Sequence, residues 1–349
     1  MRALLIAAVW TLAAPALAAD WQPPRNAFGQ PDLEGAWTNA TITPQARPAK
    51  FGTRLVMTPE EVRVAEGAAD EQIARGNQAT DPNAPAVEDG RVGGYNRGFL
   101  DPGTRVMRVG GQPRTSILTT PDGRPPAPKS GPGASEAQLA YLTVSSPYIL
   151  DAYGSVAGED ESASQARRYN NPEELSLGER CLTSFGRNGP PPMLSNGFYN
   201  NNYQIAQTRD EVLIIVEMVH DARHVRLKDR KHLPSHIRPW FGDSVGWWEG
   251  DTLVVETTNF PKAQAYMGAW ENLRVVERFR RVAKDRLHYA FTVEDPGVWA
   301  APWGGEYEFS ALDGQVYEYA CHEGNYAMPG ILAGSREADR AEAATGSAP

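Results

Sequence analysis

From Tyr199 onward, apolar and polar residues alternate in short runs that are separated by turn signals such as EGD, AKD, DPG and LDG. The runs are YQIAQT, VLIIVEMV, RHVRL, VGWW, TLVVETTNF, LRVVERFRRV, RLHYAFTVE, GEYEFSA and QVYEYAC. A period of two is typical of strands with one buried face. About nine strands at this spacing predict a mainly β fold, an antiparallel sandwich or barrel, and the tight turns favour a lipocalin-like up-and-down barrel.

The first half of the chain has a different pattern, with extended Pro-rich stretches and long Pro/Gly loops. Thr58-Pro59-Glu60-Glu61 predicts a helix start, with an N-cap, a proline in the first turn and early acids. This helix should run to about Arg75, and the sequence also predicts a strand over 114–120 and a second helix around 135–142. Too little apolar periodicity is present for a separate core. We therefore expect residues 20–180 to wrap a barrel domain over 181–334, followed by a polar tail or frayed helix over 335–349.

The first nineteen residues resemble a signal peptide, with one arginine, an apolar core and a small-residue Ala16-x-Ala18 pattern. This predicts a periplasmic or secreted protein. No second apolar run approaches the roughly 20 residues that span a bilayer, so no membrane span is expected.

Charge and cysteine content narrow the classes further. A net charge of -9 argues against a nucleic-acid partner, because phosphate binding needs a basic face. The two cysteines, Cys181 and Cys321, favour a disulfide in an oxidising compartment. A small molecule is the expected partner, and the oligomeric state is left open.

Strand alternation predicts which side chains face the interior, because residues two apart share a face. Three polar groups fall on faces that are otherwise apolar: His220 after VLIIVEMV, Glu277 within LRVVERFRR, and Asp295 at the end of LHYAFTVED. A buried carboxylate costs several kcal/mol unless it is paired. Glu277 should therefore have a partner, either a structural arginine such as Arg223 or a group with which it does acid–base work.

The segment EMVHDARH places the densest set of reactive side chains directly after an apolar strand. In an acid–base mechanism His220 would be the acid or base, Asp221 or Glu277 would orient it, and Arg223 would hold an oxyanion. These four are the candidate catalytic residues.

A second set of residues could form the walls and rim of a ligand site. Tryptophans are abundant in the second half and could provide flat surfaces for a sugar or an aromatic ligand, although core packing is their ordinary role. The candidate substrate-binding residues are Trp240, Trp248, Tyr289, Asp295, His322, Glu323 and Tyr326.

Other chemistries find little support in the sequence. His220 and His224 would pair as metal ligands on a helix, but a hairpin context removes that spacing, and neither HExxH nor His-x-His occurs. No cofactor is expected, and a divalent metal is a weak alternative. No GxSxG elbow or GxGxxG fingerprint is present.

Several longer segments together carry a family resemblance. RTSILTTPDGRPP, ERCLTSFG, EMVHDAR, GDSVGWWEGDTLVVETTNF, NLRVVERFRRV and YEYACHEGNY resemble a widespread family of exported bacterial proteins without a known activity, over about Gly93 to Arg336. The family pattern has an acid after LVV, matched by Glu256, and a cysteine pair matched by Cys181 and Cys321. The resemblance supports one fold for this region and implies no chemistry.

Two hypotheses for the function follow. The first is an exported lyase, isomerase or hydrolase that uses acid–base groups at the mouth of a barrel on a small cyclic substrate, a modified sugar or an aromatic. The alternative is a binding protein that holds a hydrophobic or aromatic small molecule without chemistry. Convergence of His220, Arg223 and Glu277 would favour the enzyme, whereas a bond from His220 to a backbone carbonyl would favour the binding protein.

Overall fold

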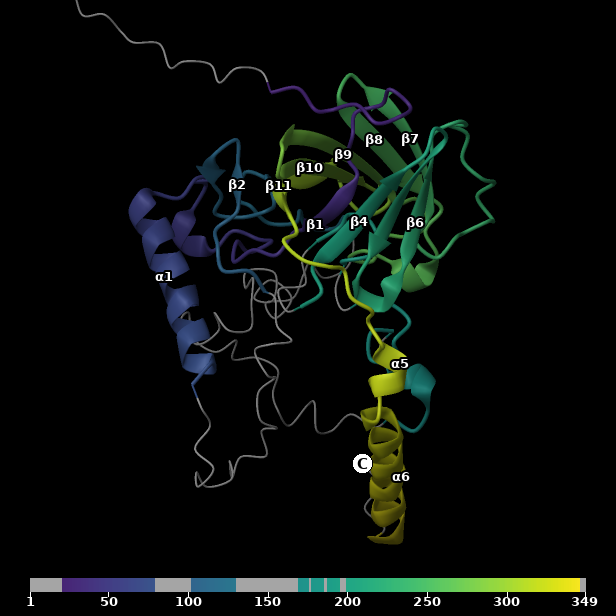
Figure 1. Ribbon diagram of the computed structural model, residues 1–349. Helices are drawn as coiled ribbons and strands as arrows, with labels where there is room; N and C mark the ends of the chain where they lie inside the picture. The colour runs from purple at the N-terminus through teal and green to yellow at the C-terminus, as the bar shows by residue number, and fades with distance from the viewer. Residues whose placement is uncertain are drawn as a thin grey trace, which may run out of the picture.

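The computed structural model describes residues 21–78, 102–129, 169–175, 177–184, 187–194 and 199–345. Figure 1 shows a β-barrel with helix α1 (Pro59–Gly76) beside it and helix α6 (Ala327–Thr345) projecting from its lower end. The predicted signal peptide and the predicted helix around 135–142 lie outside the described residues.

Nine strands of the described chain form a closed barrel in the order β1-β11-β10-β9-β8-β7-β6-β5-β4. The predicted mainly β class is therefore confirmed. The strands are β1 (Gly35–Thr38), β4 (Asn202–Gln207), β5 (Glu211–Val216), β6 (Ala222–Arg226), β7 (Asp243–Glu249), β8 (Thr252–Thr258), β9 (Arg274–Ala283), β10 (Arg286–Glu294) and β11 (Trp303–Ala311).

Two features of the barrel differ from a simple up-and-down order. Strand β1 comes from the N-terminal segment and pairs antiparallel with both β11 and β4, so the barrel is not contained within 181–334. Strands β6 and β7 are parallel, through Val225↔Ser244, because the long loop over 227–242 returns the chain to the end where β6 begins. The other neighbouring pairs are antiparallel.

Outside the barrel, the described elements are short apart from α1 and α6. The remaining elements are β2 (Arg108–Val109), β3 (Gln112–Pro113), α5 (Cys321–Gly324) and the 3-10 turns η1 (Ala49–Phe51), η3 (Pro172–Glu174), η4 (Met218–His220) and η5 (Lys262–Gln264). Helix α1 begins as predicted, with the Thr58–Glu61 capping box formed on both sides. It buries Val62 and Ala69 in a small cluster with Ile42 and Val106.

Two local predictions were wrong. Residues 114–120 form isolated bridges, at Arg114 with Val56 and at Leu118 with Gly305 of β11, and no continuous strand. The run QVYEYAC is not a strand; β11 is the last strand, and Cys321 begins α5. Of the two alternatives expected for 335–349, a polar tail or a frayed helix, the described residues are helical as far as Thr345.

The barrel interior is filled by aromatic and aliphatic side chains on the inward faces of β9, β10 and β11. Phe279, Tyr289, Tyr307 and Phe309 are fully buried, and the ring centroids of neighbours lie 5.0–5.4 Å apart. Burial of one such ring contributes on the order of 2 kcal/mol relative to exposure. This packed interior surrounds the polar groups described next.

Candidate functional site

Six polar side chains meet inside the barrel and are called here the interior cluster. Each is at most 3 % exposed. The interior cluster consists of Asn39 after β1, Tyr203 on β4, Arg223 on β6, Glu277 on β9, Tyr289 on β10 and Tyr307 on β11.

The centre of the interior cluster is an ion pair between Arg223 and Glu277. The distance from Nη2 of Arg223 to Oε2 of Glu277 is 2.8 Å, and Nη1 donates to Oε1 at 3.2 Å. Strands β6 and β9 are separated by β7 and β8 in the sheet, so the pair crosses the interior. Glu277 thus has the arginine partner that its predicted burial required. Removing either charge would leave the other without compensation in an apolar interior.

Tyrosine hydroxyls complete the interior cluster. The hydroxyl of Tyr289 donates to Oε1 of Glu277 at 2.8 Å. The Nδ2 of Asn39 donates to the hydroxyls of Tyr203 at 3.1 Å and Tyr307 at 3.0 Å. Burial raises the pKa of all three phenols above the ordinary value of 10.0, so they remain protonated donors near neutral pH.

The described residues 187–194, RNGPPPML, enter the barrel and are called here the plug segment. The backbone N–H of Met193 donates to the hydroxyl of Tyr289 at 2.8 Å, and the hydroxyl of Tyr307 donates to the carbonyl of Met193. A Cβ at Gly189 would lie 2.8 Å from the Phe241 ring, which explains the glycine at this close approach. The interior cluster therefore anchors the plug segment through two tyrosines.

Arg187 begins the plug segment and is 9 % exposed. Its guanidinium donates to the backbone carbonyls of Gln264 and Pro191 and lies 4.4 Å from the centroid of the Tyr266 ring. Burial lowers the pKa of Arg187 to about 10. Arg187 stays protonated near neutral pH, so its positive charge is buried at this end of the barrel.

The predicted catalytic residues separate into two places. Arg223 and Glu277 face the interior, as predicted. His220 is exposed, and its Nδ1 lies 3.3 Å from the backbone carbonyl oxygen of Tyr319. The prediction that His220 continues the apolar face of β5 was wrong, because β5 ends at Val216 and η4 follows with positive φ at Val219 and His220. The carboxyl of Asp221 is half-buried, and burial raises its pKa.

The predicted substrate-binding residues do not form one site. Tyr289 belongs to the interior cluster, and buried Asp295 accepts a hydrogen bond from the backbone of Gly297 at 2.9 Å. Trp248 packs partly buried against the core, whereas Trp240, in the loop over 227–242, is 38 % exposed.

The remaining three predicted substrate-binding residues lie on the C-terminal elements outside the barrel. Glu323 is exposed and Tyr326 is 85 % exposed. His322 lines an open surface cavity of about 640 Å³ between α6 and residues 172–182, with Arg180, Arg336 and Leu332. The predicted disulfide is confirmed: Cys181 and Cys321 are bonded, with a Cα–Cα distance of 5.7 Å, and attach these elements to each other. Disulfides of this kind are typical of oxidising compartments.

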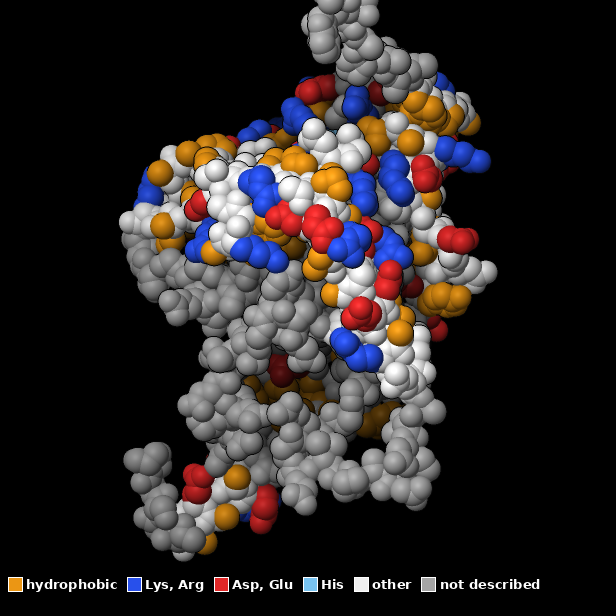
Figure 2. Space-filling model, turned by 90° about the vertical axis from the view of Figure 1, so that its left-hand side faces the viewer, with side chains coloured by type: hydrophobic (Ala, Val, Ile, Leu, Met, Phe, Trp, Pro, Cys, Tyr) orange, Lys and Arg blue, Asp and Glu red, His pale blue; other side chains and the backbone are white. Residues whose placement is uncertain are grey.

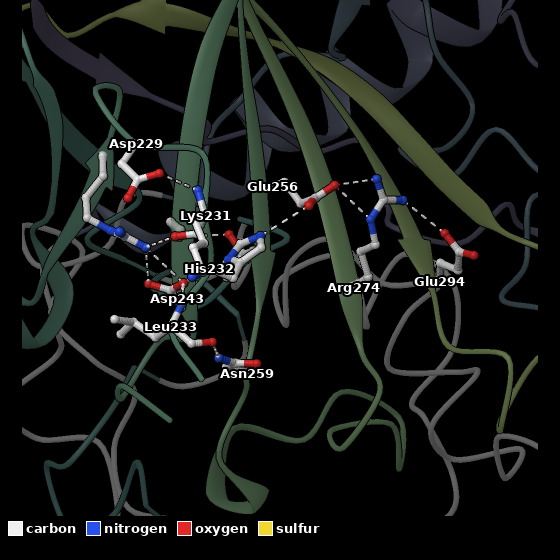
Figure 3. Close-up of polar contacts among 12 residues, drawn as sticks. Asp229, Lys231, His232, Leu233, Asp243, Glu256, Asn259, Arg274 and Glu294 are labelled. Atoms are coloured by element: carbon white, nitrogen blue, oxygen red, sulfur yellow. Dashed lines mark hydrogen bonds and ion pairs between the residues drawn. The ribbon is translucent and has the colours of Figure 1, made fainter. Parts of the chain in front are cut away.

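A chain of polar contacts lies on the opposite, outer side of strands β7 to β10. Figure 3 shows His232 between Asp243 and Glu256, with Arg274 linking Glu256 to Glu294. The Nδ1 of His232 lies 2.8 Å from Asp243 and its Nε2 lies 3.1 Å from Glu256. Each nitrogen of the His232 ring therefore contacts one carboxylate. This chain fixes the loop over 227–242 against the barrel wall.

Sequence reasoning missed several members of the site. Tyr307 shares a face with Gly305 and Phe309 in GEYEFSA, so alternation could have identified it. Asn39 and Arg187 are outside the predicted strands, and their positions depend on contacts distant in sequence. Figure 2 shows basic and acidic side chains mixed on the face that the view presents.

The described residues contain no group of three or more His, Cys, Asp or Glu arranged to hold a metal ion. Among the same residues, no helix is both long and apolar enough to cross a membrane.

Comparisons with known proteins add a distant fold likeness. No family model and no curated protein matches the sequence. Among solved structures, a crystal structure of a mutant of the fluorescent protein UnaG is similar to part of the chain, with 15 % identity and a TM-score of 0.21. The match covers 32 % of this chain and 72 % of that chain. The closed barrel described here rests on its own strand pairing.

Proposed function

We propose that the protein binds a small hydrophobic or aromatic molecule at the end of the barrel that the plug segment occupies. The observation that carries this proposal is the incomplete hydrogen bonding of buried polar groups there. Oδ1 of Asn39 and Nε of Arg223 have no partner among the described residues. Buried polar atoms without partners are rare in native proteins, and a bound molecule or water ordinarily completes them.

The surroundings of the plug segment support an apolar or aromatic ligand. Tyr266 stacks on Trp303 with ring centroids 5.7 Å apart, and Trp299 meets Trp303 edge-on at 5.3 Å. Flat rings with a few polar groups are the ordinary composition of small-molecule sites.

The plug segment sets the cost of ligand entry. Met193 and Leu194 are 0 % and 1 % exposed, and the main chain of Met193 contacts Tyr289 and Tyr307. Ligand entry therefore requires displacement of Met193 and Leu194, and the hydrogen bond from Met193 to Tyr289 contributes about 1 kcal/mol of that cost. The position of His220 favours binding over acid–base catalysis, since its ring contacts the Tyr319 carbonyl.

The proposal is tested with the neutral fluorescent probe phenylnaphthylamine on the full chain. We expect saturable binding to the wild type. The Tyr289→Phe variant should bind the probe about fivefold more tightly. It removes the hydroxyl that accepts from the N–H of Met193, a hydrogen bond worth about 1 kcal/mol, so the plug segment is displaced more easily. Tyr317→Phe is the control, because Tyr317 is 68 % exposed. Absence of saturable binding, or equal affinities for both variants, would contradict the proposal.

Acid–base catalysis by the interior cluster is the second candidate, and one contact favours it. The hydroxyl of Tyr289 donates to the carboxylate of Glu277, which also faces the guanidinium of Arg223. A phenol and a carboxylate in contact can exchange a proton with a ligand. This function predicts that Glu277→Gln abolishes turnover of a bound compound while leaving the compound bound.

A further inference from the structure

The end of the barrel near the plug segment holds buried N–H groups without acceptors. These are Nε of Arg187, Nε2 of Gln264 and Nε1 of Trp303. All three residues are at most 9 % exposed. The orphaned groups are donors, so a ligand that completes them must supply acceptor atoms.

The three residues are neighbours around the ring of Tyr266. Arg187 donates to the backbone carbonyl of Gln264 at 3.3 Å and lies over the Tyr266 ring at 4.4 Å. The Tyr266 ring in turn stacks on Trp303 at 5.7 Å between centroids. The orphaned donors therefore belong to one locus, which is called here the donor site and consists of Arg187, Gln264, Tyr266 and Trp303.

The net charge of the buried groups near the donor site favours an anionic ligand over a water molecule. Burial lowers the pKa of Arg187, and the charges of Tyr266, Tyr289 and the carboxylate of Glu277 act in the opposite direction. Glu277 is already paired with Arg223 at 2.8 Å, and Arg187 itself donates only to main-chain carbonyls among the described residues. The set of Arg187, Arg223 and Glu277 therefore carries one excess positive charge. A water would complete a donor but would leave this buried charge uncompensated.

We propose that the donor site binds the carboxylate of an aromatic acid, with Arg187, Gln264 and Trp303 donating to its oxygens and the Tyr266 and Trp303 rings covering its aromatic part. This inference rests on the proposed binding function and names the class of its ligand. A carboxylate has two oxygens in a plane, which matches a guanidinium and adjacent N–H donors. A single negative charge also balances the excess positive charge of the site.

The test is a competition between naphthoate and naphthamide for the bound phenylnaphthylamine probe. The two competitors have the same ring system and differ in charge. Naphthoate should displace the probe at a concentration about 10- to 100-fold lower than naphthamide, the range expected for a hydrogen bond to a charged group. Equal potency of the two competitors would overturn the inference, and the binding function would stand on the probe itself.

Variants locate the effect at the donor site. Trp303→Phe keeps a ring and removes the indole N–H, so it should weaken naphthoate severalfold and leave naphthamide almost unchanged. Trp247→Phe is the matched control, because the Trp247 N–H donates to Glu249 on the outer face. Arg187→Gln should abolish the preference for naphthoate, and Gln264→Leu tests the same site if the arginine variant fails to fold. An unchanged preference in both Trp303→Phe and Gln264→Leu would overturn the proposal. If the probe fails to bind the wild type, the binding function fails first and the inference fails with it.

Discussion

Neutralising Glu277 tests the energetic role of the interior cluster. The side chains of Glu277 and Arg223 are 0 % and 2 % exposed, and their closest N–O distance is 2.8 Å. Glu277→Gln keeps an oxygen that accepts from Arg223 and Tyr289 but leaves the guanidinium without a counter-charge. Removing one partner of a buried pair costs about 3–5 kcal/mol, and the retained acceptor places this variant near 3 kcal/mol.

The assay is urea unfolding followed by tryptophan fluorescence and far-UV circular dichroism. With a urea m-value of about 3 kcal/mol/M, the loss lowers the unfolding midpoint by about 1 M. The matched control is Glu249→Gln, because Glu249 is 51 % exposed and lies 3.5 Å from Arg278. Exposed pairs of this kind contribute about 0.5 kcal/mol or less, so the midpoint should barely change.

A double variant separates lost charge balance from lost packing. Arg223→Met combined with Glu277→Leu removes both charges and keeps apolar volume, so it should recover much of the stability lost in Glu277→Gln. Equal midpoint shifts in Glu277→Gln and Glu249→Gln would refute the reasoning. A double variant far less stable than Glu277→Gln would also show that the pair itself is strongly stabilising.

Three further predictions concern other parts of the chain. Replacing both Cys181 and Cys321 by Ala should lower the unfolding free energy by about 5 kcal/mol, measured by urea unfolding, because the bond closes a sequence separation of 140. The hydrogen bond from His288 lowers the pKa of Glu306 below 4.5; its stabilisation is therefore present above pH 4.5 and is lost as pH falls through the folded pKa, and Glu306→Gln should flatten that part of the stability–pH curve. His232→Leu removes donors to Asp243 and Glu256, so trypsin should cleave the loop over 227–242 faster than in the wild type, whereas an unchanged cleavage rate would contradict the role of this histidine.

Local alternation predicted the inward faces well where strands are long. Glu277 and Tyr289 lie in strands β9 and β10, where two-residue periodicity is sustained over the whole strand. Both were placed on buried faces from the sequence, and both belong to the interior cluster. The helix start at Thr58 was also predictable, because its capping box is encoded within four residues.

The same rule failed where the chain leaves a strand. His220 was extrapolated two positions beyond Met218, but η4 begins there, and positive φ at Val219 and His220 turns the chain out of the strand conformation. The polar residues that follow the apolar residues of β5 do not indicate where the last hydrogen bond between β5 and its neighbouring strands is made. The predicted four-residue catalytic set was therefore divided between the interior and the exterior.

Contacts between residues far apart in the chain could not be predicted from local sequence patterns. Strand β1 closes the barrel through Trp37↔Tyr203 and Trp37↔Ala311, contacts across about half or more of the chain. Four residues from a Pro-rich segment carry no period that identifies such partners. The plug segment is similar, because Arg187 and Met193 acquire their positions from Gln264 and Tyr289 and not from local propensity.

Native mass spectrometry of the full chain tests the central claim most directly, because it detects a bound small molecule without choosing a probe in advance. The account predicts a mass above that of the protein, which returns to the protein mass when the complex is activated in the gas phase and releases a single aromatic acid. The Trp303→Phe variant should retain less of the compound than Trp247→Phe. A wild-type protein found at its own mass alone, which also fails to take up naphthoate added in excess, would contradict the account.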